Sequence, residues 1–566
     1  MKTLKYLFGT VSVMILGMFV ATSCTDANDW GVDSSYERLF APTGSISVEA
    51  FDSYAEISFK KVPGAKAYLV ELCTDTLSDD NPEVSDNSIV EIFESNVGVV
   101  NNLFGETSYY LRVRSISDEE PASKWLYYRT GSGKGTFKTK AEQLFYPVTK
   151  ADILENAIHV TWLEDADVDL LTIKKGSELI ESVTIDEALR STAEYTFNNL
   201  TPTTSYTIEI FKGESRRGQL KVTTAAAPPA ANYVYELPED VNIIDNDLLK
   251  QIAEEAKTAA SGGAESKAFA TSVIQNYSAT LVIPAGREVE LYTEGSSSKS
   301  NTTIPDGMSI AFFGKAGGEA PTIKFTKNID LEGSHAFVTF QNVKVVDNGA
   351  GYFVNQSKNS TVGTFTVQDC EMSGFKTSFF RLQGNYGITI NQLTLDNSIF
   401  HDMCSGYSFI HIDAGSGKGS VQNIKIHNCT VYNVAPNGKM FIYSNKTDMQ
   451  SIEIDYLTMY NSIGNNNYLI DFNADSSKNP VWGAEVFMIT NSIFAKTPDE
   501  VTKNIRAKVM PTYMNTFTTK DFFKKLNGAE ALSLSSEELF KDPENGDFTL
   551  KTTAIQAGDQ RWIPEE

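Results

Sequence analysis

The stretch Ile426-His427-Asn428-Cys429-Thr430-Val431 decides the fold, because close variants of it return along the chain. The five copies are anchored on their third residues, which are Asp369, Asn397, Asn428, Tyr456 and Asn491, at spacings of 28, 31, 28 and 35. Apolar residues flank each anchor with the period of two that marks a β-strand. Self-similarity of this length, carried by strands, predicts a solenoid in which each coil buries the apolar side of its neighbours.

A second strand follows the anchors, as in Ile410-His411-Ile412-Asp413. Alternation turns the first and third residues of this strand inward and the second and fourth outward. Four coils therefore present two outward rows, which are Arg381, His411, Tyr443 and Asp471, and Gln383, Asp413, Asn445 and Asn473. A row that mixes charged, aromatic and amide side chains favours contact with a ligand over simple solvation. Trp482 in an adjoining loop is a further aromatic candidate.

The repeats resemble the right-handed parallel β-helix of pectate-lyase-like proteins, and we assign residues 233–566 to such a domain. Apolar residues on one side of Asp247–Ala260 predict a helix, which in this resemblance caps the open edge of the first coil. The polar anchors share one register, so their side chains are expected to form a ladder that satisfies backbone groups of the turns.

Two smaller units precede the solenoid. Residues 42–140 and 145–224 consist of short alternating strands separated by turn residues, which predicts two antiparallel sandwiches. The string Leu200 to Ile210, with a corner tyrosine at Tyr206, resembles the fibronectin type III signature, and Tyr109 stands at the equivalent place in the first unit. Residues 225–232 contain Ala225 to Ala231 (AAAPPAA) and are expected to be a stiff linker. The whole chain is thus expected to be all-β.

The amino terminus predicts export. Two lysines precede an apolar run that ends in small residues before Cys24, so residues 1–23 are interpreted as a signal peptide. The junction resembles a bacterial lipobox, which implies that Cys24 carries a lipid anchor. The acidic tether at residues 24–41 resembles the leader of surface-exposed lipoproteins of Bacteroidetes-type bacteria, which implies an outer-membrane, outward-facing location. The combination with the sandwiches and solenoid resembles lipoproteins associated with polysaccharide utilisation, which implies other glycan-uptake proteins as partners.

The charge of the chain excludes one class of partner. The formal net charge is −24, and no run of Lys and Arg is long enough to form a basic stripe. Nucleic acid is therefore not an expected ligand. Cys73, Cys370, Cys404 and Cys429 show no zinc-like spacing and are expected to be buried thiols. His159, His335 and His427 are interpreted as structural, whereas His401, next to Asp402, is left open.

Three functions remain open at this stage. The preferred hypothesis is a surface lipoprotein that binds an extended polysaccharide, acidic polymers included, through the outward rows. The second is a polysaccharide lyase that acts by β-elimination, with Arg381 or His411 as the base and calcium, held by Asp413 and Asp471, as a candidate cofactor. The third is a structural or adhesive surface protein. A cluster of carboxylates beside Arg381 would favour the lyase, and an aromatic platform flanked by amides would favour binding.

Overall fold

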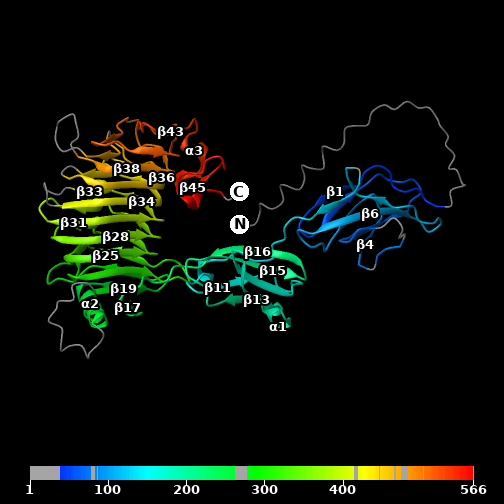
Figure 1. Cartoon of the computed structure of the whole chain (residues 1–566), viewed down its shortest axis with the longest axis horizontal. Helices are drawn as coiled ribbons and strands as arrows, with labels where there is room; N and C mark the ends of the chain where they lie inside the picture. The colour runs from blue at the N-terminus through cyan, green and yellow to red at the C-terminus, as the bar shows by residue number, and fades with distance from the viewer. Residues whose placement is uncertain are drawn as a thin grey trace. The chain divides into compact units, whose positions relative to one another are not determined.

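The computed structural model describes residues 38–77, 83–85, 87–131, 133–261, 277–412, 419–444, 447–464, 467–472, 482–500 and 502–564. The predicted signal peptide, Cys24 and most of the tether lie outside these ranges, as do Asp413, Asn445 and Asn473. Among the described residues, no helix has the length and apolar character needed to cross a membrane. The described chain is nearly all β-structure, as expected (Figure 1).

The first sandwich packs two antiparallel sheets around one core, which includes Ile57 and Val100 from one sheet and Tyr68 and Leu111 from the other. The hydroxyl of Tyr109 accepts a hydrogen bond from the Phe104 amide at 2.9 Å, which forms the expected corner. The strands are β1 (Ser47–Ala50), β2 (Ala55–Ser58), β3 (Ala67–Cys73), β4 (Ile89–Phe93), β5 (Val97–Val100), β6 (Ser108–Ile116), β7 (Leu126–Tyr127), β8 (Arg129–Thr130), β9 (Gly133–Lys134) and β10 (Thr136–Lys138).

The second sandwich repeats this plan with Trp162 buried at its centre. The Tyr206 hydroxyl accepts from the Thr201 amide at 2.9 Å, so the fibronectin type III-like corner is present here too. A short helix, α1 (Glu187–Thr192), interrupts the strands and was not expected from the sequence. The strands are β11 (Ile158–Thr161), β12 (Leu170–Lys175), β13 (Glu178–Thr184), β14 (Glu194–Phe197), β15 (Ser205–Lys212) and β16 (Ser215–Thr223).

The carboxy-terminal part is the expected parallel β-solenoid, whose strands stack in layers in Figure 1. Each coil contributes strands to three faces. The first face contains β17 (Tyr233–Glu236), β19 (Tyr277–Ile283), β22 (Met308–Gly314), β25 (Gly333–Gln341), β28 (Ser360–Gln368), β31 (Ile388–Asp396), the first parts of β34 (Gly419–Val434) and β36 (Met449–Tyr460), β38 (Ala484–Thr490) and β41 (Thr512–Met514).

The other two faces complete each coil. The second face contains β18 (Ile243–Ile244), β20 (Glu288–Leu291), β23 (Thr322–Phe325), β26 (Lys344–Asp347), β29 (Glu371–Ser373), β32 (Ile399–Met403), the later parts of β34 and β36, β39 (Ile493–Ala495), β42 (Phe517–Thr518) and β43 (Glu530–Ala531). The third face contains β21 (Thr302–Ile304), β24 (Ile329–Leu331), β27 (Tyr352–Gln356), β30 (Ser378–Leu382), β33 (Ile410–Ile412), β35 (Ile442–Ser444), β37 (Ile470–Asp471) and β40 (Ile505–Arg506).

The amino-terminal end of the solenoid is covered by α2 (Asn246–Ala260), which confirms the predicted helix to within one residue. The Asp245 side chain accepts from the Leu248 amide and caps its first turn. Leu249 and Ile252 are fully buried in the same core as the first strands. The helix therefore shields the apolar interior that the first coil would otherwise expose.

The repeated anchor marks the corner between the first and second faces. All five anchors have a left-handed backbone, with φ of 54° at Asp369, 45° at Asn397, 52° at Asn428, 53° at Tyr456 and 47° at Asn491. Asn and Asp adopt this conformation more readily than other residues with a Cβ, which explains why they recur at this position. The sequence repeat is thus the signature of a turn as well as of a strand.

Candidate functional site

The third face brings together the first predicted row. Strand pairing aligns Arg381 with His411, His411 with Tyr443, and Tyr443 with Asp471. The flanking residues Phe380, Ile410, Ile442 and Ile470 are fully buried in the core, as the alternation predicts. Four adjacent strands therefore direct these four polar side chains to the outside of the solenoid.

Two side chains of this row, His411 and Asp471, are buried although they point outward from the core. His411 is only 8% exposed and Asp471 only 4%. The His411 ring stacks on Tyr443 with ring centroids 4.7 Å apart, and Tyr407 lies 4.8 Å away on another side. The outward orientation of His411 and Asp471 therefore does not make them solvent-exposed, because neighbouring aromatic and basic side chains lie over them.

Arginine guanidinium groups stack on tyrosines along this face. The Arg381 guanidinium lies 4.1 Å from the Tyr407 ring centroid. The Arg506 guanidinium lies 4.3 Å from the ring centroid of Tyr468. Such stacking holds a guanidinium in a fixed plane while its edge N–H groups stay directed away from the ring.

Arg506 extends the row by one strand, since β40 pairs it with Asp471. Its Nε and Nη2 donate to the two carboxylate oxygens of Asp471, each at 2.8 Å. Donation of these hydrogen bonds to the Asp471 carboxylate raises the pKa of Arg506 above its ordinary value. Arg506 was not predicted from the sequence, although its spacing of 35 residues from Asp471 repeats the spacing between Tyr456 and Asn491.

The remaining candidates divide into two groups. Gln383 lies near the row, and its Nε2 donates to Asn355 Oδ1 at 2.9 Å, while Asn355 itself aligns with Arg381. Trp482 instead packs partly buried against the solenoid core. The structure therefore joins Gln383 to the row and places Trp482 as a packing residue. Asp413, Asn445 and Asn473, which lie outside the described ranges, stay predictions.

Asp413 and Asp471 are the calcium ligands that the sequence suggests for a lyase. Both oxygens of Asp471 already bind Arg506, so a cation there would have to displace a bidentate guanidinium. In the part of the chain that the structure describes, no group of three or more His, Cys, Asp and Glu side chains is arranged to hold a metal ion.

His401 lies on the second face between two carboxylates. Its Nδ1 is 2.7 Å from Asp402 and its Nε2 is 3.4 Å from Glu371, and its ring stacks on Tyr432. Burial acts to lower the pKa of His401, but the two carboxylates raise it overall. His335 differs, because burial lowers its pKa and its Nδ1 contacts the Met308 carbonyl at 2.7 Å.

The four cysteines of the described chain are free and buried, as expected. Burial raises the pKa of the Cys370 thiol to about 12, and it also raises the pKa of Cys404 and Cys429. These thiols therefore remain protonated at neutral pH and are poor nucleophiles.

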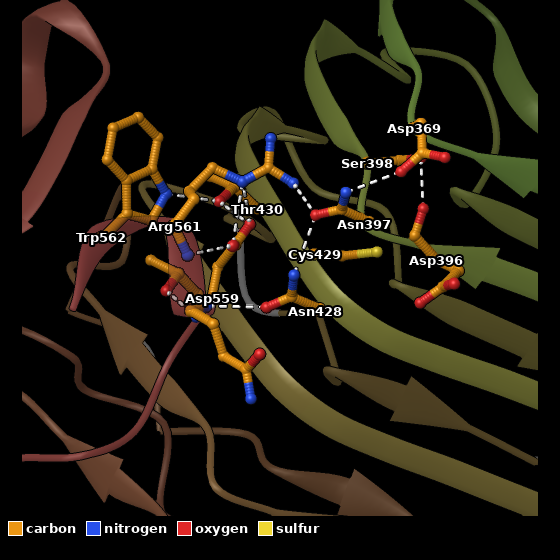
Figure 2. A network of polar contacts seen from close by, with 12 residues as sticks. Asp369, Asp396, Asn397, Ser398, Asn428, Cys429, Thr430, Asp559, Arg561 and Trp562 are labelled. Atoms are coloured by element: carbon orange, nitrogen blue, oxygen red, sulfur yellow. Dashed lines mark hydrogen bonds and ion pairs between the residues drawn. The ribbon is translucent and has the colours of Figure 1, made fainter. Parts of the chain in front are cut away.

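The corner ladder continues into the carboxy-terminal tail, as Figure 2 shows. Asn397 donates to Asp369 and Asn428 donates to Asn397, at 2.6 and 2.8 Å, which confirms the ladder for these three anchors. Asn491 instead donates to Asp455 at 2.8 Å. The Gln560 amide then donates to Asn428, and Arg561 donates to Asn397. Burial raises the pKa of Asp559, whose carboxylate accepts from Thr430 and Arg561. This network fastens the tail to the corner between the first and second faces of the solenoid.

Comparisons with known proteins give one family model and several solved structures that match parts of the chain. The model of a domain of unknown function, DUF5123, matches residues 452–562. These residues include the last coils and the tail whose contacts appear in Figure 2. No curated protein matches the chain.

Solved structures similar to this chain contain fibronectin type III domains. A two-domain segment of chicken tenascin has 17% identity, covers 32% of this chain and 99% of its own, and gives a TM-score of 0.21. The FN1–FN3 domains of chicken CNTN1 have 12% identity, 33% and 69% coverage and a TM-score of 0.13. The central fibronectin III array of RIM-binding protein has 12% identity, 34% and 66% coverage and a TM-score of 0.13.

Proposed function

We propose that this protein binds an extended anionic polysaccharide along the third face of its solenoid. The observation that carries the proposal is the aligned series from Arg381 to Arg506, in which two guanidiniums stack on tyrosines at the two ends of a row that spans five strands. Adjacent strands lie ~4.8 Å apart, so the row extends over four such intervals and suits an elongated ligand. Guanidinium N–H groups donate to carboxylate or sulfate groups, and aromatic faces pack against the C–H side of sugar rings. Because the Nε and Nη2 edge of Arg506 is already bound to Asp471, the proposal relies mainly on Arg381.

The location belongs to the same proposal. Lipid attachment at Cys24 would anchor the protein in the outer membrane, facing outward, where it would pass glycan to other uptake proteins. The lipobox-like junction before Cys24 and the acidic residues after it support this location. Replacing Cys24→Ala should release the protein from the membrane fraction and abolish labelling by a fatty-acid analogue. Retention of the label would contradict the anchor.

Binding is tested with the soluble chain that begins at residue 25. It is run through gels loaded with polygalacturonate, alginate, glycosaminoglycans or neutral glycans, with and without calcium. We expect retardation by an anionic glycan and a loss of affinity of roughly tenfold or more for Arg381→Ala, since a hydrogen bond to a charged group contributes about 1.5–3 kcal/mol. Arg129→Ala, which removes an exposed arginine from the first sandwich, is the matched control.

The other outcomes point to the alternative functions. Ultraviolet absorbance from an unsaturated product that disappears in Arg381→Ala or His411→Ala would identify a lyase and overturn the binding proposal. Equal retardation of the wild type and Arg381→Ala would remove the third face from the binding surface. Neither retardation nor product on any glycan would favour a structural or adhesive role.

A further inference from the structure

The turns that precede the strands of the third face carry lysines and tyrosines in alternation. From one coil to the next, the series is Lys376, Tyr407, Lys439, Tyr468 and Lys503, which we call the turn row. Its members precede the strand row, Arg381, His411, Tyr443, Asp471 and Arg506, by five, four, four, three and three positions. Backbone hydrogen bonds stack successive turns, as from the Tyr407 amide to the Thr377 carbonyl at 2.7 Å. The two rows therefore run side by side along the solenoid.

Tyrosines of the turn row contact arginines of the strand row. The Tyr407 ring centroid lies 4.1 Å from the Arg381 guanidinium. The Tyr468 ring centroid lies 4.3 Å from the Arg506 guanidinium and 5.3 Å from Lys503 Nζ. A ligand that lies along the third face would therefore contact both rows.

The lysines of the turn row are available to a ligand. Lys376 is exposed, and Lys439 and Lys503 are half-buried. Within the ranges that the structure describes, none of these lysines forms an ion pair with a carboxylate. Arg506 differs, because its Nε and Nη2 already bind Asp471. An anionic ligand would supply the lysines with the counterion that the described part of the chain does not provide.

Positive charge alternates along the two rows when they are taken together. The first, third and fifth coils carry a lysine in the turn row, whereas the second and fourth carry neither lysine nor arginine in either row. The cations are Lys376 with Arg381, then Lys439, then Lys503 with Arg506. The coils between them carry Tyr407 with His411 and Tyr468 with Asp471. Coils lie ~4.8 Å apart, so the lysines repeat every ~9.6 Å.

This period matches a chain that is charged on every second sugar. A pyranose ring in an extended β-linked chain advances by nearly the spacing of one coil, so every second ring would meet a lysine. The ring between them would meet a tyrosine, and aromatic faces pack against the C–H side of uncharged sugars. A further acidic group on the fourth coil would instead lie near the Asp471 carboxylate, which strand pairing places beside Tyr443.

We propose that the turn row binds a polysaccharide in which acidic and uncharged sugars alternate. This inference rests on the proposed function and names its substrate class. The acidic groups pair with Lys376, Lys439 and Lys503, and the uncharged sugars between them lie against Tyr407 and Tyr468. The row spans five coils, which corresponds to a segment of about five sugars.

The test compares hexasaccharides by calorimetric titration of the chain that begins at residue 25. Hyaluronan and unsulfated chondroitin alternate a uronate with an uncharged amino sugar, whereas hexagalacturonate carries twice as many carboxylates. We expect at least one alternating oligomer to bind at least tenfold more tightly than hexagalacturonate, although its charge is lower. Simple attraction between opposite charges predicts the reverse order.

The other results of this titration separate the inference from the proposed function. Equal or tighter binding of hexagalacturonate would overturn alternation, while binding of an anionic glycan that depends on Arg381 would still stand. Binding of none of the oligomers would also overturn the inference, and the gels loaded with polymeric glycans decide the proposed function separately.

Variants of the turn row locate the binding. Lys376→Gln, Lys439→Gln and Lys503→Gln should each weaken binding of the alternating oligomer roughly tenfold, because each removes one charge-assisted hydrogen bond. The dependence of affinity on salt should also become weaker in each variant. Lys425→Gln, which changes an exposed lysine on the first face, is the matched control and should leave affinity unchanged. Unchanged affinity in Lys439→Gln, or an equal loss in Lys425→Gln, would overturn the assignment to the turn row.

Discussion

The residue at the corner of each coil determines how much strain its left-handed backbone conformation carries. Tyr456 occupies the position that Asn397, Asn428 and Asn491 occupy in other coils, with the same left-handed φ. A Cβ-bearing residue other than Asn or Asp pays roughly 1–2 kcal/mol for this conformation. We therefore expect Tyr456→Asn to stabilise the protein by about 1 kcal/mol, measured by denaturant unfolding.

The reciprocal variant is the control for that prediction. Asn428→Tyr introduces the same strain at a position where the amide also links Asn397 and the Gln560 amide, so it should destabilise the protein. If Tyr456→Asn lowered stability instead, the contact between the Tyr456 and His427 rings, 6.2 Å apart, would outweigh the backbone strain.

The residue scale also shows what the sequence could predict. The left-handed corners and the buried Phe380, Ile410 and Ile442 follow from local rules of backbone preference and alternation, which any single coil already obeys. The low exposure of His411 and Asp471 does not follow, because it depends on Tyr407, in the turn before β33, and on Arg506, in the next coil.

At the scale of elements, docking of the carboxy-terminal tail requires its backbone at Gly558 to lie close to the solenoid. The tail contains α3 (Ser536–Leu539), β44 (Phe540–Asp542) and β45 (Asp547–Leu550) and ends in a short 3₁₀ turn, Gln560–Trp562. Gly558 has φ of 81°, and a Cβ there would lie 2.6 Å from Thr458 Oγ1. Its amide donates to the Asn491 carbonyl at 2.8 Å, so the backbone has little freedom to retreat.

We therefore expect Gly558→Ala to loosen the tail at a cost of about 1–3 kcal/mol, the usual range for overpacking. Hydrogen exchange should increase from Ile555 to Trp562. Gly546→Ala is the matched control, because Gly546 has φ of 83° but its nearest neighbour would lie at 3.4 Å. The backbone strain is common to both variants, so only the close contact distinguishes them. Equal exchange in the two variants would show that the close approach is unimportant.

At the scale of the whole molecule, the first sandwich and the solenoid belong to different compact units, so their stabilities should be largely separate. The first sandwich contains a fully buried ion pair, in which Arg112 Nε donates to Glu71 Oε2 at 2.6 Å. Burial acts to raise the pKa of Glu71, but hydrogen bonds from Arg112, Ser85 and Ser88 set it below its ordinary value. This pair therefore stabilises the sandwich above the unfolded pKa of Glu71, and the stabilisation is lost as pH falls through the folded pKa.

Arg112→Met leaves the Glu71 carboxylate buried without its cation, which should cost about 3–5 kcal/mol at neutral pH. Hydrogen exchange should rise from β1 to β10 and stay unchanged across the solenoid. Lys66→Met, which breaks an exposed pair with Asp118, should change neither region. Exchange that also rose in the solenoid would contradict separate stabilities.

Without Arg112, burial raises the pKa of Glu71, so acidification now favours the folded state of the variant. The difference in stability between wild type and Arg112→Met should therefore shrink as pH falls from 7 toward about 4.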